Sequence, residues 1–105
     1  MRKKDSHIAG RIREEIRAVD PKAQVILFGS RARGDAKKDS DWDILILVDY
    51  LITMEIERSF RDRLFDLELE TGEVFSTFVR NKKAWNTKHR VTPLYMNIKE
   101  EGIRL

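Results

Sequence analysis

Apolar residues recur along the chain in two patterns, one typical of helices and one typical of strands. From Ser6 to Val19 and from Thr53 to Thr71, apolar residues return at steps of four, four and three, which lines one face of an amphipathic helix. Gln24–Phe28 and Asp43–Val48 are short runs that are apolar after their first residue, which is typical of strands buried on both faces. The pattern predicts two long helices and two central strands.

The remaining segments predict a third strand and a last helix. Between Val74 and Val79 the residues alternate, with Ser76 on the same face as Val74 and Phe78. The segment from Asn81 to His89 predicts only a loose helical turn around Trp85, whereas Thr92-Pro93 is a typical helix start and Gly102 a stop. Helices and strands therefore mix along the chain, which predicts an α+β (α/β-like) fold with a small mixed sheet and helices packed against it.

Composition restricts the class of protein. At 105 residues, with 41% apolar and 37% charged residues, the chain predicts one folded domain spanning residues 1–105. No cysteine is present, which excludes disulfides and thiolate metal sites and favours a cytoplasmic location. No stretch is long and apolar enough to predict a membrane span. The dense basic and aromatic surface of a sequence-specific nucleic-acid binder is also missing.

The positive charge lies towards the beginning of the chain. Residues 1–38 contain 11 Lys or Arg against five Asp or Glu, although the net charge of the whole chain is only +3. This imbalance suits a polyphosphate ligand. The alternative is a solvated helix face with an ordinary basic tail.

Two motifs in the middle of the chain carry candidate chemistry. Gly29-Ser30 directly follows the first predicted strand, where a glycine lets the backbone approach a phosphate and the hydroxyl adds a donor. Asp41 and Asp43 open the second strand and project to the same face, while Trp42 points the other way. A divalent cation such as Mg²⁺ would relieve the repulsion between these carboxylates. Alone, the two aspartates would only mark a strand end.

The combination of these motifs resembles a known family. Gly29-Ser30-Arg31-Ala32-Arg33-Gly34, followed by Ser40-Asp41-Trp42-Asp43 and an apolar strand, is similar to the signature of the DNA polymerase β-like nucleotidyltransferases, specifically their small stand-alone (minimal) members. The resemblance implies that Gly29 and Ser30 bind nucleoside triphosphate, and that Asp41 and Asp43 are catalytic ligands of Mg²⁺ or Mn²⁺. It also implies transfer of a nucleoside monophosphate, with ATP as a candidate donor, to a hydroxyl.

The two arginines after the turn have two interpretations. Arg31 and Arg33 could each reach a phosphate with a bidentate guanidinium. Alternatively, each could pair with Asp35 or Asp39 and hold the loop in place. The sequence leaves both interpretations open.

The resemblance is incomplete on the third predicted strand. The family has a third carboxylate there, and alignment on Gly72 places the expected acid at Ser76. Serine is a neutral, weaker metal ligand, so a catalytically impaired nucleotide-binding module, regulatory or antitoxin-like, is the alternative hypothesis. Glu73 could turn inward and replace the acid, or Asp41 and Asp43 could suffice for one metal.

The resemblance also implies a partner. A chain of this length leaves little room for an acceptor-binding domain, and in this family the corresponding partner is a small helical protein of the HEPN type. This implies a toxin–antitoxin pair in which the partner either supplies the acceptor or is the acceptor.

Overall fold

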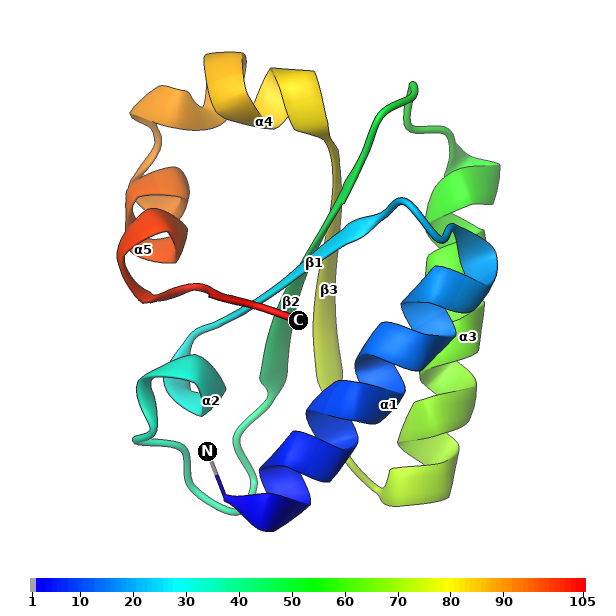
Figure 1. The fold of residues 1–105 in the computed structure, drawn as a ribbon, viewed down its shortest axis with the longest axis vertical. Helices are drawn as coiled ribbons and strands as arrows, with labels where there is room; N and C mark the ends of the chain where they lie inside the picture. Colours follow the sequence, from blue (N-terminus) through cyan, green and yellow to red (C-terminus); the bar gives the residue numbers. More distant parts are fainter. Residues whose placement is uncertain (1) are drawn as a thin grey trace.

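The computed structural model describes residues 2–105 and contains a four-stranded sheet between helices (Figure 1). The helices are α1 (Lys3–Val19), α2 (Ser30–Arg33), α3 (Met54–Thr71), α4 (Lys82–Thr87) and α5 (Pro93–Glu101), with a 3-10 turn at Lys88–Val91. The strands are β1 (Gln24–Phe28), β2 (Trp42–Val48), β3 (Phe75–Asn81) and β4 (Ile103–Arg104). This confirms the predicted α+β architecture.

The sheet is mixed, and its register places the end of β1 beside the starts of β2 and β3. Its strand order is β3-β2-β1-β4. Strand β1 pairs antiparallel with β2 and β4, whereas β2 and β3 are parallel. Phe28, the last residue of β1, lies opposite Asp43 of β2, which in turn lies opposite Ser76 of β3. The Gly29 turn, Asp43 and Ser76 therefore meet at the same end of the sheet.

Helices α1 and α3 cover one face of the sheet (Figure 1). Their apolar stripes, which include Ile12, Ile16, Phe60 and Leu64, are fully or almost fully buried against Trp42 and alternate residues of β1 and β2. The helices are also joined by ion pairs from Arg11 to Glu70 and from Arg63 to Glu15. The predicted amphipathic helices are confirmed, and α1 begins three residues earlier than predicted.

Helices α4 and α5 cover the opposite face. There Trp85 of α4 and Ile98 of α5 pack with Phe28, Leu45 and Leu47 in a second, smaller cluster. Because β1 and β2 contribute to both clusters, they are buried on both sides, as their continuous apolar pattern predicts. Asp43 alternates with Trp42 along β2, so it lies on this α4–α5 side of the sheet together with Leu45 and Leu47.

The larger differences from the prediction lie in the last third of the chain. The loose turn predicted around Trp85 is a regular helix, α4, because the Asn81 side chain caps it by accepting from the Ala84 amide at 3.0 Å. Strand β3 runs to Asn81, two residues beyond the predicted end. Strand β4 was not predicted. Gly72 adopts the predicted left-handed cap, with φ 76°.

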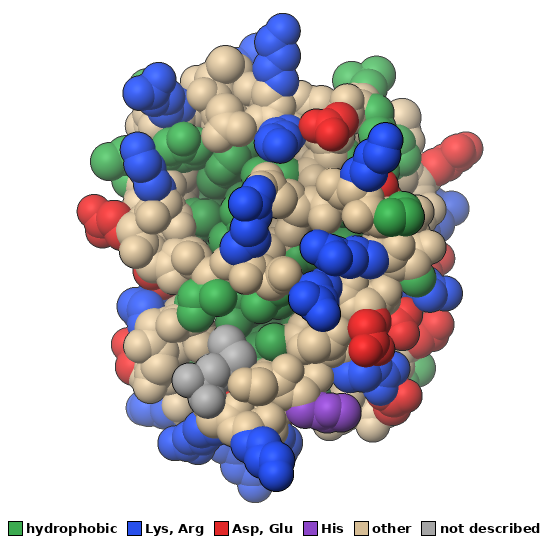
Figure 2. Space-filling view, in the orientation of Figure 1, with side chains coloured by type: hydrophobic (Ala, Val, Ile, Leu, Met, Phe, Trp, Pro, Cys, Tyr) green, Lys and Arg blue, Asp and Glu red, His purple; other side chains and the backbone are tan. Residues whose placement is uncertain are grey.

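Within residues 2–105, every helix is too short or too polar to cross a membrane. Lys and Arg side chains are dispersed over the face shown in Figure 2, and acidic side chains gather mainly on the side where α1 and α3 lie. On this face, the basic residues do not form a single stripe.

Candidate functional site

The turn at Gly29 requires glycine for two separate reasons. Gly29 has φ 73° and ψ −159°, a backbone conformation that other residues almost never adopt. In addition, a Cβ at this position would collide with the Asp43 carboxylate, lying 3.1 Å from its Cγ. The glycine therefore brings the backbone of the turn directly against Asp43, so the two sequence motifs form one site.

Alternation along β2 fixes the direction of the aspartates. Trp42 is completely buried in the α1–α3 cluster, so its neighbour Asp43 projects towards the opposite face. Asp41 lies on that same side, since its Oδ2 accepts a long hydrogen bond of 3.4 Å from the Ser76 hydroxyl. The structure thus brings Asp41, Asp43 and Ser76 together on one side of the sheet.

The electrostatics of the pair suit a cation. Burial raises the pKa of Asp43 above its ordinary value, and the neighbouring charge of Asp41 raises it further. Arg33 acts in the opposite direction. Two hard oxygen donors with unfavourable excess negative charge fit a divalent ion such as Mg²⁺, which would neutralise phosphate charge when bound.

A third protein carboxylate does not complete this pair. Among residues 2–105, no group of three His, Cys, Asp or Glu side chains is arranged to hold a metal ion. Glu73 points elsewhere: its carboxylate lies 3.6 Å from Arg31 and 3.4 Å from the Trp42 indole nitrogen, on the α1–α3 side. The Ser76 hydroxyl, at the position where the sequence resemblance predicts a third acid, lies beside Asp41. A metal held here would need phosphate or water oxygens to complete its coordination.

Arg31 lies beneath the loop that joins α2 to β2. Its side chain is only 8% exposed, and its guanidinium donates to the carbonyl oxygens of Ser40, at 2.9 Å, and Lys38, at 3.3 Å. It also forms an ion pair with Asp5 and lies 5.1 Å above the Trp42 ring. These contacts favour the loop-holding interpretation of Arg31, although its partners are not the predicted Asp35 or Asp39.

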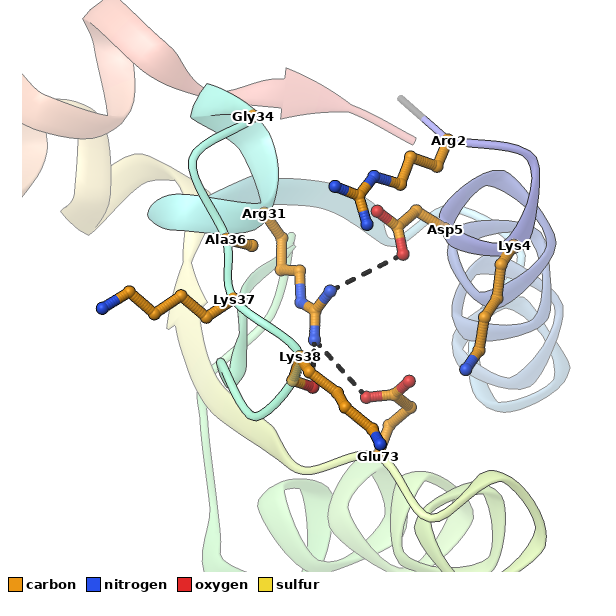
Figure 3. Close-up of a pocket in the computed structure, with 9 residues that line it drawn as sticks. All are labelled: Arg2, Lys4, Asp5, Arg31, Gly34, Ala36, Lys37, Lys38 and Glu73. Carbon is orange, nitrogen blue, oxygen red and sulfur yellow. Dashed lines mark hydrogen bonds and ion pairs between the residues drawn. The ribbon is translucent and has the colours of Figure 1, made fainter.

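A pocket of about 460 Å³ surrounds Arg31, between the start of α1 and the α2–β2 loop (Figure 3). Arg2, Lys4, Lys37 and Lys38 line it, together with the carboxylates that pair with Arg31. Figure 3 shows the Arg31 guanidinium pointing towards Asp5 and Glu73. Because Trp42 and Glu73 lie on the α1–α3 side, this pocket is separate from the side to which Asp43 points.

Arg33 lies on the other side of α2 and is more exposed. Its guanidinium pairs with Asp35 at 3.3 Å, which the loop-holding interpretation predicts, and with Glu101 at 2.8 Å. Hydrogen bonds to these two carboxylates raise the pKa of Arg33. With 48% of its side chain exposed, Arg33 remains accessible to a ligand at the turn.

Glu101 is the residue that sequence reasoning missed. Its Oε2 accepts a hydrogen bond of 2.9 Å from the Gly29 amide as well as the one from Arg33. Its charge also contributes to the raised pKa of Asp43. No motif in the sequence marks this residue, because 72 positions separate it from Gly29 and only the packing of α5 brings the two together.

A mixed sheet between helices, with a glycine turn placed against paired aspartates, defines the class of protein as a nucleotidyltransferase fold. Comparison with family models establishes the membership: residues 9–104 match the nucleotidyltransferase domain. The chain belongs to this family.

Individual relatives agree with this assignment. The chain is 37% identical over 79 residues to the Methanocaldococcus jannaschii protein named "Putative protein adenylyltransferase MJ0604", covering 75% of this chain and 73% of that protein. The fold of this chain matches a crystal structure of a toxin–antitoxin MntA–HpeT mutant, with TM-score 0.65 and 17% identity, and the match covers 90% of this chain and 69% of that one. A toxin–antitoxin structure with AMP-PNP matches with TM-score 0.63, at the same identity and coverage.

Proposed function

We propose that this protein transfers a nucleoside monophosphate from ATP to a hydroxyl of a partner protein, with Mg²⁺ held by Asp41 and Asp43. The observation that carries the proposal is the contact between the Gly29 turn and Asp43. It would place the phosphates of a nucleotide bound at the turn next to the two carboxylates. Phosphoryl chemistry needs this proximity, because positioning and charge neutralisation supply most of the catalysis.

The residues have distinct roles in this proposal. Gly29 and Ser30 bind the phosphates through the turn, and Arg33 supplies a guanidinium beside them. Asp41 and Asp43 hold the cation. Arg31 keeps the α2–β2 loop in place, because its guanidinium is already used by carbonyl and carboxylate oxygens of the protein.

The identity of the donor and acceptor draws on the relatives. A relative that is 37% identical is named as a protein adenylyltransferase, which supports ATP as donor and a protein hydroxyl as acceptor. One structural neighbour is a toxin–antitoxin complex and another contains AMP-PNP. These neighbours support a partner protein, for which we propose a small helical protein of the HEPN type.

One observation favours a second candidate function. A serine, Ser76, lies beside Asp41 where the resemblance predicts a third acid, and Glu73 is turned away. A site with two carboxylates binds a metal and its nucleotide less tightly and lacks a general base. The second candidate is therefore a nucleotide-binding module without turnover, which regulates a partner by binding alone.

A transfer assay separates the two functions. The protein is incubated with ATP labelled at the α-phosphate, Mg²⁺ or Mn²⁺, and the product of its neighbouring gene. Label on the partner that disappears in Asp41→Asn and Asp43→Asn supports the enzyme. Saturable nucleotide binding without transfer under either metal supports the module, and absence of both binding and transfer refutes both functions.

A further inference from the structure

A carboxylate from the far end of the chain already binds the turn proposed to hold phosphate. Oε2 of Glu101 accepts from the Gly29 amide at 2.9 Å and from the Arg33 guanidinium at 2.8 Å. The two donors therefore converge on one anionic oxygen. The same amide and guanidinium are the groups that the proposed function assigns to a phosphate oxygen.

We infer that Glu101 is an internal competitor of the nucleotide, which must displace its carboxylate from Gly29 and Arg33 in order to bind. The inference rests on the proposed function, because it concerns access to the same turn. It assigns to Glu101 the control of nucleotide affinity, a role outside the family's signature motifs.

The position of Glu101 makes displacement possible without unfolding. It is the last residue of α5, its side chain is 20% exposed, and Gly102 follows it. The short strand beyond it, β4, pairs with β1 through Ile103 and Arg104, and the Leu105 amide donates to the Val25 carbonyl. A rotation of the side chain into solvent is therefore enough to free both donors, while Ile98 keeps α5 anchored in the core.

Charge favours a metal-bound nucleotide over the Glu101 carboxylate at these two donors. The Glu101 carboxylate lies in the field of Asp43, and each anion opposes the other. A triphosphate that arrives with a divalent ion offers the same two donors an anionic oxygen and also supplies positive charge for Asp41 and Asp43. The carboxylate cannot supply that charge.

An alternative role for Glu101 makes the opposite prediction. If its carboxylate replaced the missing acid at Ser76, it would help to hold the metal and nucleotide, and its removal would weaken binding. If it competes with the phosphates, its removal strengthens binding. The sign of the change therefore decides between the two roles.

The test measures affinity for Mg²⁺ with AMP-PNP by calorimetry in the full chain, with inorganic pyrophosphate as a second probe. Glu101→Gln keeps the shape of the side chain but removes its charge. Glu100→Gln is the matched control, because Glu100 is the adjacent residue, is exposed, and undergoes the same change of net charge. We expect Glu101→Gln to bind about tenfold more tightly than the parent, a change of about 1.4 kcal/mol, because a neutral amide oxygen forms weaker hydrogen bonds to Gly29 and Arg33 than the carboxylate does. The control should stay within about twofold of the parent, since exposed charges contribute little.

A second variant and a ligand-free signal complete the test. Glu101→Asp keeps the charge but shortens the side chain, so it should also bind more tightly than the parent. The Gly29 amide resonance in the absence of nucleotide should move in both Glu101 variants and stay unchanged in the Glu100 control. Equal or weaker nucleotide binding by Glu101→Gln, when the parent binds, overturns the inference and leaves the proposed function standing. If no variant and no parent protein binds nucleotide, the proposed function fails and the inference fails with it.

Discussion

Replacement of Gly29 by alanine should damage both the fold and the site, and by amounts that can be separated. Gly29 combines φ 73° and ψ −159° with contact to the Asp43 carboxylate. The substitution adds a single methyl group. The backbone must then either strain or move, and the carboxylate must leave its place.

The expected loss of stability follows from the backbone geometry. A residue other than glycine in a sparsely populated region costs about 1–3 kcal/mol, which is a fraction of the roughly 5–15 kcal/mol that stabilises a typical domain. Gly29→Ala should therefore fold. Its site should be altered more severely, because the new Cβ occupies space that the Asp43 carboxylate fills. Displaced groups around a metal typically reduce its affinity roughly 10- to 100-fold.

Gly34→Ala is the matched control. Gly34 ends α2 with φ 88° and ψ 9°, and a Cβ there would meet nothing within 4 Å. Alanine in this left-handed conformation should cost about 1–2 kcal/mol, with no effect on Asp43. Urea denaturation measures the free energy of unfolding of both variants, and calorimetry with Mg²⁺ and AMP-PNP measures their affinity. Gly29→Ala that folds and binds the nucleotide as tightly as Gly34→Ala would refute the argument that close approach to Asp43 creates the site.

Three further substitutions test other parts of the site. Burial and the charge of Asp41 raise the pKa of Asp43, so the folded state keeps this proton to a higher pH than the unfolded chain does. The folded state therefore loses stability as the pH rises from the unfolded pKa through the folded pKa. Asp43→Asn should be more stable than the parent in urea at pH 7, and the difference should disappear below the ordinary carboxyl pKa. Arg31→Lys should lose about 2 kcal/mol of stability and expose residues 35–40 to limited proteolysis, because lysine cannot reproduce the hydrogen bonds to the loop carbonyls. A large loss of nucleotide affinity with an intact loop would contradict this role. Ser76→Asp adds a carboxylate beside Asp41. Without metal, thermal unfolding of this variant should begin at a lower temperature than in the parent, and Mn²⁺ should raise its unfolding temperature more than it raises that of the parent. An unchanged response to Mn²⁺ would exclude this position as the third ligand.

The parts of the structure that the sequence predicts are those that depend on neighbouring residues. Alternation around Trp42 gives the direction of Asp43, and the continuous apolar runs give two strands buried on both faces. Gly72 at the end of an apolar stripe gives a left-handed cap. In each case, a local pattern and the tertiary fold require the same conformation.

The parts that the sequence does not predict depend on distant contacts. Strand β4 is two residues long, which is too short to show a periodicity, and it forms because β1 offers an unpaired edge. Arg31 binds carbonyl oxygens, which no side-chain pattern can reveal. Glu101 reaches Gly29 only because α5 packs through Ile98 against the sheet. A motif search finds residues that lie close together in the sequence and misses Glu101, whose contacts depend on the packing of α5.

The two clusters on opposite faces of the sheet each contain one of the chain's two tryptophans. Trp42 is completely buried beneath Arg31, next to Asp43, whereas Trp85 packs 5.2 Å from the Tyr95 ring of α5. Intrinsic fluorescence can therefore be assigned to one layer at a time by replacing the other indole with phenylalanine. Emission from Trp42 would report events at the aspartates, and emission from Trp85 would report movement of the helix that carries Glu101. The protein thus contains its own pair of optical probes for the order in which cation and nucleotide act.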